Sequence, residues 1–71
     1  MRGKIVSLRQ TSGGCPEQYE GKTAEGDDVF ARERHGEWRI ELNGEIIAEG
    51  SGDDAYAALA GEFEIDCEVT R

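Results

Sequence analysis

The sequence is poor in the residues that build metal centres and nucleophilic active sites. One histidine, two cysteines and one proline occur in 71 residues. His35 has no second histidine and no neighbouring cysteine, so a zinc site is not expected. An enzyme would have to combine His35 with Cys15 and with Glu33 or Glu37, and nothing in their spacing indicates such a site. We therefore expect a protein that is not an enzyme and that holds no metal and no cofactor.

Long apolar runs are also missing. No stretch is long enough to span a bilayer, and the start MRGKIVSLRQ lacks the apolar segment of a signal peptide. We therefore expect a cytoplasmic location and no membrane contact. Stable disulfides are disfavoured in that compartment, so Cys15 and Cys67 are expected to be thiols. A bond between them is the alternative, and it would contribute roughly 4 kcal/mol through loop closure.

Basic residues are scarce relative to acidic ones. Eight Lys and Arg against 16 Asp and Glu give a formal net charge of -8. In residues 62–69 the acids alternate with apolar residues, which places carboxylates on one face of a strand. This predicted acidic edge consists of Glu62, Glu64, Asp66 and Glu68. The negative charge argues against direct nucleic-acid binding and favours a partner protein with a basic surface, although adaptation to a high-salt cytoplasm is an alternative explanation.

Turn signals and hydrophobic alternation predict one small α+β domain over residues 1–71. The expected architecture is an antiparallel β-meander sheet of five or six strands with one short helix at about residues 53–60. The expected strands cover residues 4–9, 18–23, 29–35, 38–42, 45–49 and 63–69. So small a core only just offsets the conformational entropy of the chain, and a homodimer, a disulfide or a bound partner could add stability.

Two tight turns define the expected register of the central strands. Asn43-Gly44 is a strong hairpin signal, because a type I′ turn needs positive φ at both central positions. His35-Gly36 is the expected centre of the preceding turn. Cross-strand partners share a face, and both turns independently agree on one apolar face. The expected core residues of these strands are Val29, Ala31, Trp38, Ile40, Leu42 and Ile47.

The first two strands carry weaker register signals. A loop of three residues at 25–27 would place Glu20 opposite Arg32, which pairs opposite charges. The core-side residues of the second strand would then be Tyr19, Gly21 and Thr23. In the first strand, regular alternation places Val6 and Leu8 on one face. The opposite face would carry Ile5, Ser7 and Arg9.

The segment SGDDAYAALAG at residues 51–61 predicts the helix. Ser51 or Asp53 is the expected N-cap, and Gly61 is the expected C-terminal stop. The side chains expected to dock on the sheet are Tyr56, Leu59 and Ala60. In the strand that follows, Cys67 is in phase with the apolar residues and is expected in the core.

Three arginines stand out against the acidic background. Arg32, Arg34 and Arg39 fall on the same outward face of one expected hairpin, with Phe30 beside them. Like charges opposite each other cost stability unless neighbouring glutamates offset them, so a surface charge lattice is one explanation. The other is a binding patch for an anion, a nucleotide or an acidic protein surface.

The first half of the chain carries a short motif in front of this hairpin. It reads CPEQYEG at residues 15–21 and is followed by a turn, by Phe30 to Arg34 with alternating arginines, and by Gly36. The pattern resembles small uncharacterised proteins of actinobacterial phages and their hosts, which carry Cys-Pro-x-Gln-aromatic-Glu-Gly before an Arg-aromatic-Arg hairpin. Glu33 stands where those proteins have an aromatic residue. The resemblance implies a phage or mobile-element accessory protein and transfers no functional residue.

The leading hypothesis is therefore a non-enzymatic acidic interaction protein. In the phage context it would be an inhibitor that binds the basic surface of a host defence or nucleic-acid-handling protein. Exposed Phe30 and Ile46 would supply apolar anchors. The alternative is a small oligomeric ligand-binding module, in which Arg32, Arg34 and Arg39 capture an anionic, nucleotide-like molecule.

Overall fold

The computed structural model describes residues 2–14 and 16–71, and the expected thiol of Cys15 lies outside these residues. Within them the chain forms seven strands and one helix. In chain order these are β1 (Lys4–Gly13), β2 (Glu17–Thr23), β3 (Asp28–Arg34), β4 (Glu37–Leu42), β5 (Glu45–Ser51), α1 (Ala55–Glu62), β6 (Glu64–Ile65) and β7 (Val69–Thr70).

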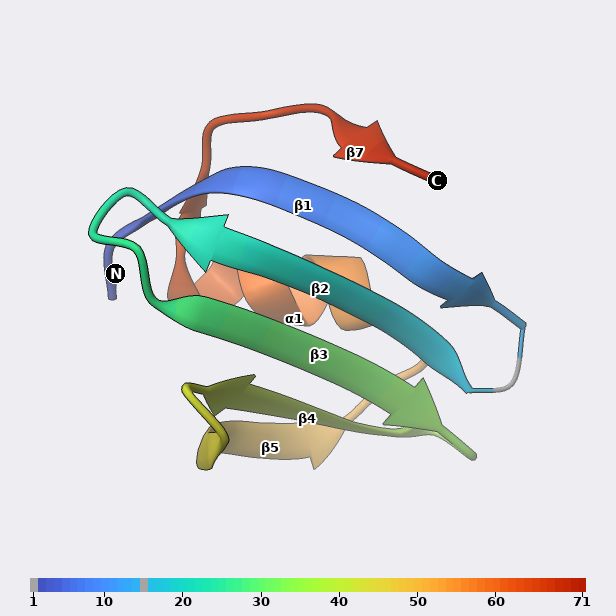
Figure 1. Cartoon of the computed structure of the whole chain (residues 1–71). Helices are drawn as coiled ribbons and strands as arrows, with labels where there is room; N and C mark the ends of the chain where they lie inside the picture. The colour runs from blue at the N-terminus through green and yellow to red at the C-terminus, as the bar shows by residue number, and fades with distance from the viewer. Residues whose placement is uncertain (1, 15) are drawn as a thin grey trace.

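All strands belong to one curled sheet that covers α1 on one side (Figure 1). The spatial order is β5-β4-β3-β2-β1-β6, and β7 also pairs with β1. Strands β1 to β5 are antiparallel, whereas β6 and β7 run parallel to β1. The prediction of a small β-rich fold with one short helix is thus confirmed. The prediction of a pure meander is wrong, because α1 carries the chain across the sheet and a crossover of this kind returns a parallel strand.

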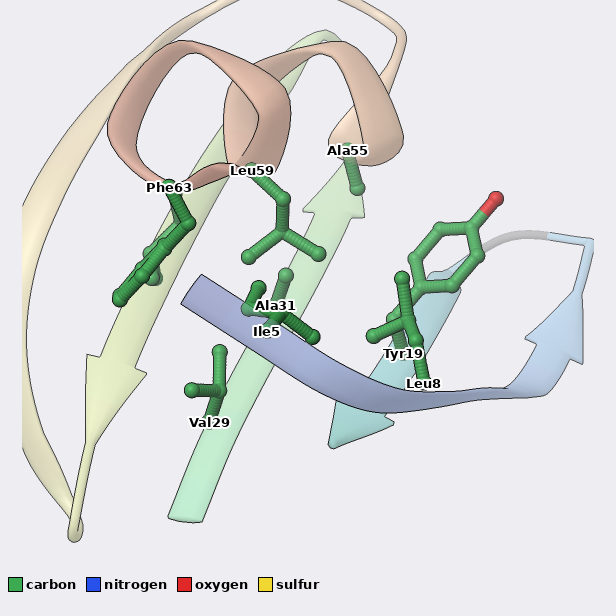
Figure 2. Close-up of a cluster of buried hydrophobic side chains, with 9 residues drawn as sticks. Ile5, Leu8, Tyr19, Val29, Ala31, Ala55, Leu59 and Phe63 are labelled. Atoms are coloured by element: carbon green, nitrogen blue, oxygen red, sulfur yellow. The ribbon is translucent and has the colours of Figure 1, made fainter. Parts of the chain in front are cut away.

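The core lies between α1 and the inner face of the sheet (Figure 2). Leu59 points from α1 towards Ile5 and Ala31 on the strands, and Phe63 belongs to the same buried cluster. The largest fully buried side chains are Phe63, Ile5, Ile40 and Leu59. Trp38, Leu42 and Ile47 are only partly buried and pack around this centre, as Cys67 does. One small apolar centre therefore holds the sheet to its helix, and each of its members contributes a large share of the stability.

A β-bulge in β1 overturns the expected alternation of this strand. The pairing with β2 shifts between Ile5 and Ser7, so the extra residue changes which side chains face inward. Ile5 and Leu8 are both buried, whereas Val6 is 43% exposed. The grouping of Val6 with Leu8 was therefore wrong.

The two predicted tight turns occur where the sequence indicated them. The central residues His35, Gly36, Asn43 and Gly44 all have positive φ. The register from Val29 opposite Leu42 to Arg34 opposite Glu37 is as predicted. Next to the second turn, Glu41 faces Ile46 as predicted.

Beyond that point a bulge at Ile47 changes the pairing of β4 with β5. Ile40 faces Ala48 instead of Ile47, and Arg39 faces Glu49 instead of Ala48. The prediction was wrong because the extra residue displaces all later partners by one. As a consequence, Glu49 lies beside Arg39 on the outer face of the sheet.

The loop between β2 and β3 is longer than expected. Lys22 pairs with Asp28, and Glu20 faces Phe30 rather than Arg32. Five residues, 23–27, thus separate the last paired positions of β2 and β3 instead of three, and there the Thr23 hydroxyl accepts a hydrogen bond of 3.0 Å from the Asp27 amide. A register error of two leaves the faces unchanged. Accordingly Tyr19 and Thr23 are buried on the core side, as predicted.

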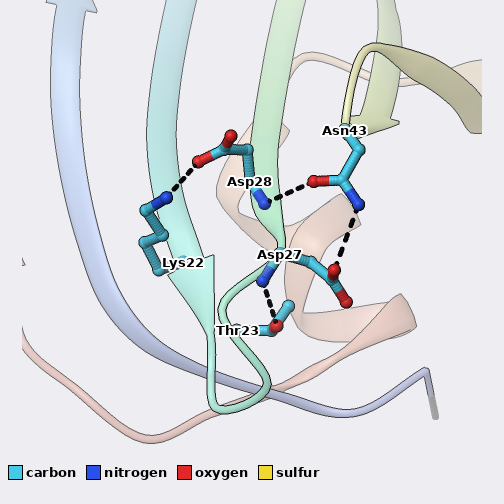
Figure 3. Close-up of polar contacts among 5 residues, drawn as sticks. All are labelled: Lys22, Thr23, Asp27, Asp28 and Asn43. Carbon is cyan, nitrogen blue, oxygen red and sulfur yellow. Dashed lines mark hydrogen bonds and ion pairs between the residues drawn. The ribbon is translucent and has the colours of Figure 1, made fainter.

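Asn43 joins this loop to the turn between β4 and β5 (Figure 3). Its Oδ1 accepts from the Asp28 amide at 2.9 Å, and its Nδ2 donates to Asp27 Oδ1 at 3.1 Å. Lys22 Nζ lies 2.6 Å from Asp28 Oδ1 on the other side of the loop. Asn43 therefore has two roles. Its backbone adopts the positive φ of 52° that the turn needs, and its side chain links the turn to the loop.

These two roles of Asn43 can be separated by substitution. Asn43→Gly keeps positive φ accessible but removes both hydrogen bonds, and we expect it to lower the free energy of unfolding by about 1 kcal/mol. Asn43→Ala should lower it by about 1 kcal/mol more, because alanine at positive φ is strained. Urea unfolding of the three proteins measures both steps. Equal stability of wild type and Asn43→Gly would show that the side-chain bonds contribute nothing.

Helix α1 begins and ends later than predicted. Asp54, not Ser51 or Asp53, is the N-cap, with Oδ1 accepting from the Ala57 amide at 3.0 Å. The carboxylate of Glu17 also accepts from the Ala55 amide at 2.9 Å. Both carboxylates satisfy amides that a helix leaves free at its start.

At the other end the helix continues past the predicted stop at Gly61. It ends at Glu62, and Phe63 is the C-cap, whose amide donates to the Leu59 carbonyl at 2.8 Å. Burial of the Phe63 ring outweighs the tendency of glycine to end a helix. Ala60 is exposed, so its predicted docking was wrong, while Leu59 docks as predicted.

The burial of Tyr19 leads to a prediction for stability at alkaline pH. Burial raises the pKa of its phenol above 10.0, and the carboxylates of Glu17 and Asp54 add to the shift. The unfolded chain therefore ionises first, and the stabilising effect of the neutral phenol is lost as pH rises through the folded-state pKa. When the pH is raised from about 8 to about 11, we expect the urea midpoint of Tyr19→Phe to fall less than that of the wild type. Equal falls in both proteins would contradict this.

Candidate functional site: the arginine hollow

The outer face of the sheet, opposite α1, presents its side chains in rows across the strands. Arg32 lies between Gln18 and Arg39, and Arg39 in turn lies beside Glu49. The next row towards the turn at His35 and Gly36 consists of Arg34, Glu37 and Ser51. The three arginines therefore share one face, as the hairpin pattern predicted.

These two rows line a hollow at the end of β3, β4 and β5. Its volume is about 500 Å³, within the range of small-molecule sites. We call it the arginine hollow. Its lining residues are Arg32, Arg34, His35, Glu37, Trp38, Arg39, Glu49, Gly50 and Ser51. The predicted neighbour Phe30 is not among them and lies one row away, between Glu20 and Glu41.

The guanidinium groups of the hollow are poorly compensated. Arg39 Nε lies 3.5 Å from Glu41 Oε2, but it is buried and makes no hydrogen bond in the described structure. Among residues 2–14 and 16–71, no ion pair includes Arg32 or Arg34. In the same residues no side-chain hydrogen bond has one of these three arginines as its donor. Their planar donor groups are therefore available to an anion.

Behind the arginine rows, on the core side of β4 and β5, Trp38 packs against a glycine-containing segment. A Cβ atom at Gly50 would lie 2.6 Å from Trp38 Cζ2, so the indole ring packs directly on the backbone. Trp38 Nε1 also donates to the Ser51 carbonyl at 3.3 Å. This packing, which needs the register set by the bulge at Ile47, holds the ring in place.

The predicted acidic edge is divided among several elements. Glu62 ends α1 and Glu64 lies in β6, whereas Asp66 and Glu68 lie between β6 and β7. The continuous strand expected over residues 63–69 does not form, so the four carboxylates do not make one row of a single strand. The register against β1 also shifts by one residue between the two pieces, because Ile5 pairs with Ile65 whereas Leu8 pairs with Val69.

Basic residues near the N-terminus partly neutralise this acidic edge. Arg2 Nε lies 2.7 Å from Glu62 Oε1. Lys4 Nζ lies 3.5 Å from Glu64 Oε2 and 3.7 Å from Asp66 Oδ2. These pairs are largely exposed and contribute about 1 kcal/mol or less each. Contact of the acidic edge with a partner stays a prediction.

A second, smaller hollow of about 260 Å³ lies on the outer face of β1, β2 and β3. It contains Arg9 and Lys22, but each has an acidic neighbour. Lys22 pairs with Asp28 at 2.6 Å, and Arg9 faces Glu20 across the strands. Its charges are therefore more nearly balanced, and it is the weaker candidate for an anion.

The Cys67 thiol is expected to be weakly reactive. Cys67 is a free, half-buried thiol, and burial together with the Asp66 charge raises its pKa. A raised pKa lowers the thiolate fraction and hence the reactivity. In the part of the chain that the structure describes, no three His, Cys, Asp or Glu side chains converge on a possible metal position.

The described part of the chain also contains no helix with the length and apolar character needed to cross a bilayer. Comparison with known proteins identifies no relative, because no protein-family model, no curated protein and no solved structure matches the chain. Function is therefore inferred from the geometry of the arginine hollow.

Proposed function

We propose that this chain is a non-enzymatic binding protein that captures an anionic group in the arginine hollow. The observation that carries the proposal is the pairing of Arg32 with Arg39 directly across two strands, with Arg34 on the same face. Side chains so paired have Cβ atoms about 5 Å apart, and like charges at that distance repel. An anion bound between the two guanidinium groups would attract both of them and offset their repulsion. Binding would therefore stabilise the folded protein.

Arginine is well suited to this task. Its guanidinium group is planar and binds two oxygens of a carboxylate or phosphate at once. The rigid hairpin of β3 and β4 holds two of these groups side by side, with both turn residues at positive φ. Preorganisation of this kind lowers the entropy lost when a ligand binds.

Anion-dependent stability tests the proposal. At ten times its dissociation constant a ligand adds about 1.4 kcal/mol, which raises Tm by about 6–11 °C in a domain of this size. We expect phosphate to give such a rise relative to chloride at equal ionic strength, and Arg32→Gln/Arg39→Gln to abolish it.

Arg9→Gln is the matched control, because Arg9 lies on the same outer face but outside the hollow. It corrects for the general stabilising effect of phosphate on folded proteins. An equal phosphate response in both variants would reject a site at the arginine hollow.

A protein partner with a basic surface remains a second proposal. It is supported by the exposure of Glu64 and Asp66, whose side chains are 58% and 64% accessible, and by Ile46, which is 49% exposed. Charge complementarity would accelerate association, and Ile46 would supply apolar contact. Binding of a candidate partner should weaken in Glu64→Lys/Asp66→Lys, and unchanged binding at low salt would exclude the acidic edge.

A further inference from the structure

We infer that the occupant of the arginine hollow is a nucleoside monophosphate, that is, one compact phosphate monoester joined to a group rich in hydrogen-bond donors. This inference rests on the proposed function and names its ligand class. It follows from the division of the hollow into a basic part and an acidic part, from its size, and from the His35 ring in its lining.

The basic part of the hollow, formed by Arg32, Arg34 and Arg39, has the size and charge to bind a single phosphate group. Arg32 and Arg39 are direct partners across β3 and β4, and Arg34 is two residues further along β3. Successive residues on one face of a strand are about 7 Å apart, so all three guanidinium groups can reach one phosphate. Bidentate donation to its oxygens would satisfy donors that have no acceptor among the described residues.

The acidic part of the hollow, formed by Glu37 and Glu49, limits how far the negative charge of a ligand can extend. Glu49 lies beside Arg39 on β5, and Glu37 lies beside Arg34 on β4. Neighbouring strands are about 4.8 Å apart, so these carboxylates lie next to the phosphate position. Neither forms an ion pair within residues 2–14 and 16–71. They would repel a second or third phosphate and accept hydrogen bonds from hydroxyl or amino groups, as acidic residues do with ribose hydroxyls in nucleotide sites.

The wall and the size of the hollow suit the remainder of a mononucleotide. Its volume of about 500 Å³ exceeds what a phosphate ion would need. His35, at the turn that borders the hollow, offers a ring on which a base can stack without regard to its sequence identity. Ser51 adds a hydroxyl at the edge of the same row as Glu37.

Calorimetric titration at fixed ionic strength tests the inference with AMP, ATP, adenosine and inorganic phosphate as probes. We expect AMP to bind at least tenfold more tightly than phosphate or adenosine, because it uses both parts of the hollow. ATP should bind more weakly than AMP, because its outer phosphates meet Glu37 and Glu49. Tighter binding of ATP than AMP would overturn the inference.

Glu49→Gln tests the role of the acidic part directly. It should raise the affinity for ATP relative to AMP, whereas Glu45→Gln on the same strand, outside the hollow, should leave the ratio unchanged. If Glu49→Gln leaves the ratio of the ATP and AMP affinities unchanged, Glu49 does not limit the number of phosphates as inferred. Binding of phosphate and AMP with equal affinity would refute the nucleotide inference but leave the anion site intact. If no anion binds, both the inference and the proposed function fail.

Discussion

Gly21→Ala is expected to lower the free energy of unfolding by about 3 kcal/mol or more, a large part of the about 4–10 kcal/mol available to a domain of this length. A Cβ atom at Gly21 would overlap the carbonyl oxygen of Ser7 and lie 3.1 Å from Leu8 Cδ1. Gly21 also pairs with Leu8 on β1 and with Val29 on β3. The clash cannot be relieved by one side chain, because moving the backbone would disturb two ladders at once.

Gly61→Ala is the matched control for this substitution. Its Cβ atom would have no neighbour within 4 Å, and its backbone is helical. Alanine should therefore stabilise the protein by about 0.5–1 kcal/mol through helix propensity. Urea unfolding followed by circular dichroism measures both variants. A Gly21→Ala protein within about 1 kcal/mol of wild type would show that β1 and β2 do not approach as closely as described.

Phe63→Ala is expected to cost about 3–5 kcal/mol. The ring is 1% exposed and is one of the largest buried side chains of the core (Figure 2). It also links α1 to β6, since the next amide, that of Glu64, donates to the Gly3 carbonyl at 2.9 Å. Its removal therefore leaves a cavity and loosens the attachment of the C-terminal strands to β1.

Hydrogen exchange distinguishes this local loosening from a uniform loss of stability. The amides of Glu64 and Asp66, which donate to the carbonyls of Gly3 and Ile5, should lose protection before those of β3 and β4. Ile46→Ala, at a side chain that is 49% exposed, should change stability by less than about 1 kcal/mol. Comparable losses in both variants would contradict the central place of Phe63 in the core.

The parts of the fold that were predictable from sequence are those defined by local turn chemistry. His35-Gly36 and Asn43-Gly44 each combine a residue tolerant of positive φ with a glycine, and they specify the register of β3 with β4. The bulges in β1 and at Ile47 have no comparable signal, because they depend on which side chains the core can accommodate. The parallel strands β6 and β7 depend on pairing across the whole chain, which periodicity cannot show.

In the candidate site, too, the features set by local turns were predictable and those set by a bulge were not. The common face of Arg32, Arg34 and Arg39 could be derived from alternation and one turn. Glu49 could not be assigned to the hollow, because regular pairing placed Ala48 beside Arg39. The acidic edge was overestimated for a related reason, since alternation in residues 62–69 is compatible with a strand but does not require one.

The parallel pairing of β6 with β1 has a consequence for the rate of folding. Lys4 and Glu64 are partners although they are 60 residues apart in the chain, whereas consecutive strands from β1 to β5 are separated by only a few residues. Short hairpins form within microseconds, but closing a long loop has a higher entropic cost. We therefore expect the β1–β5 meander to assemble first and to act as a template on which β6 and β7 pair with β1, with this last step setting the overall refolding time.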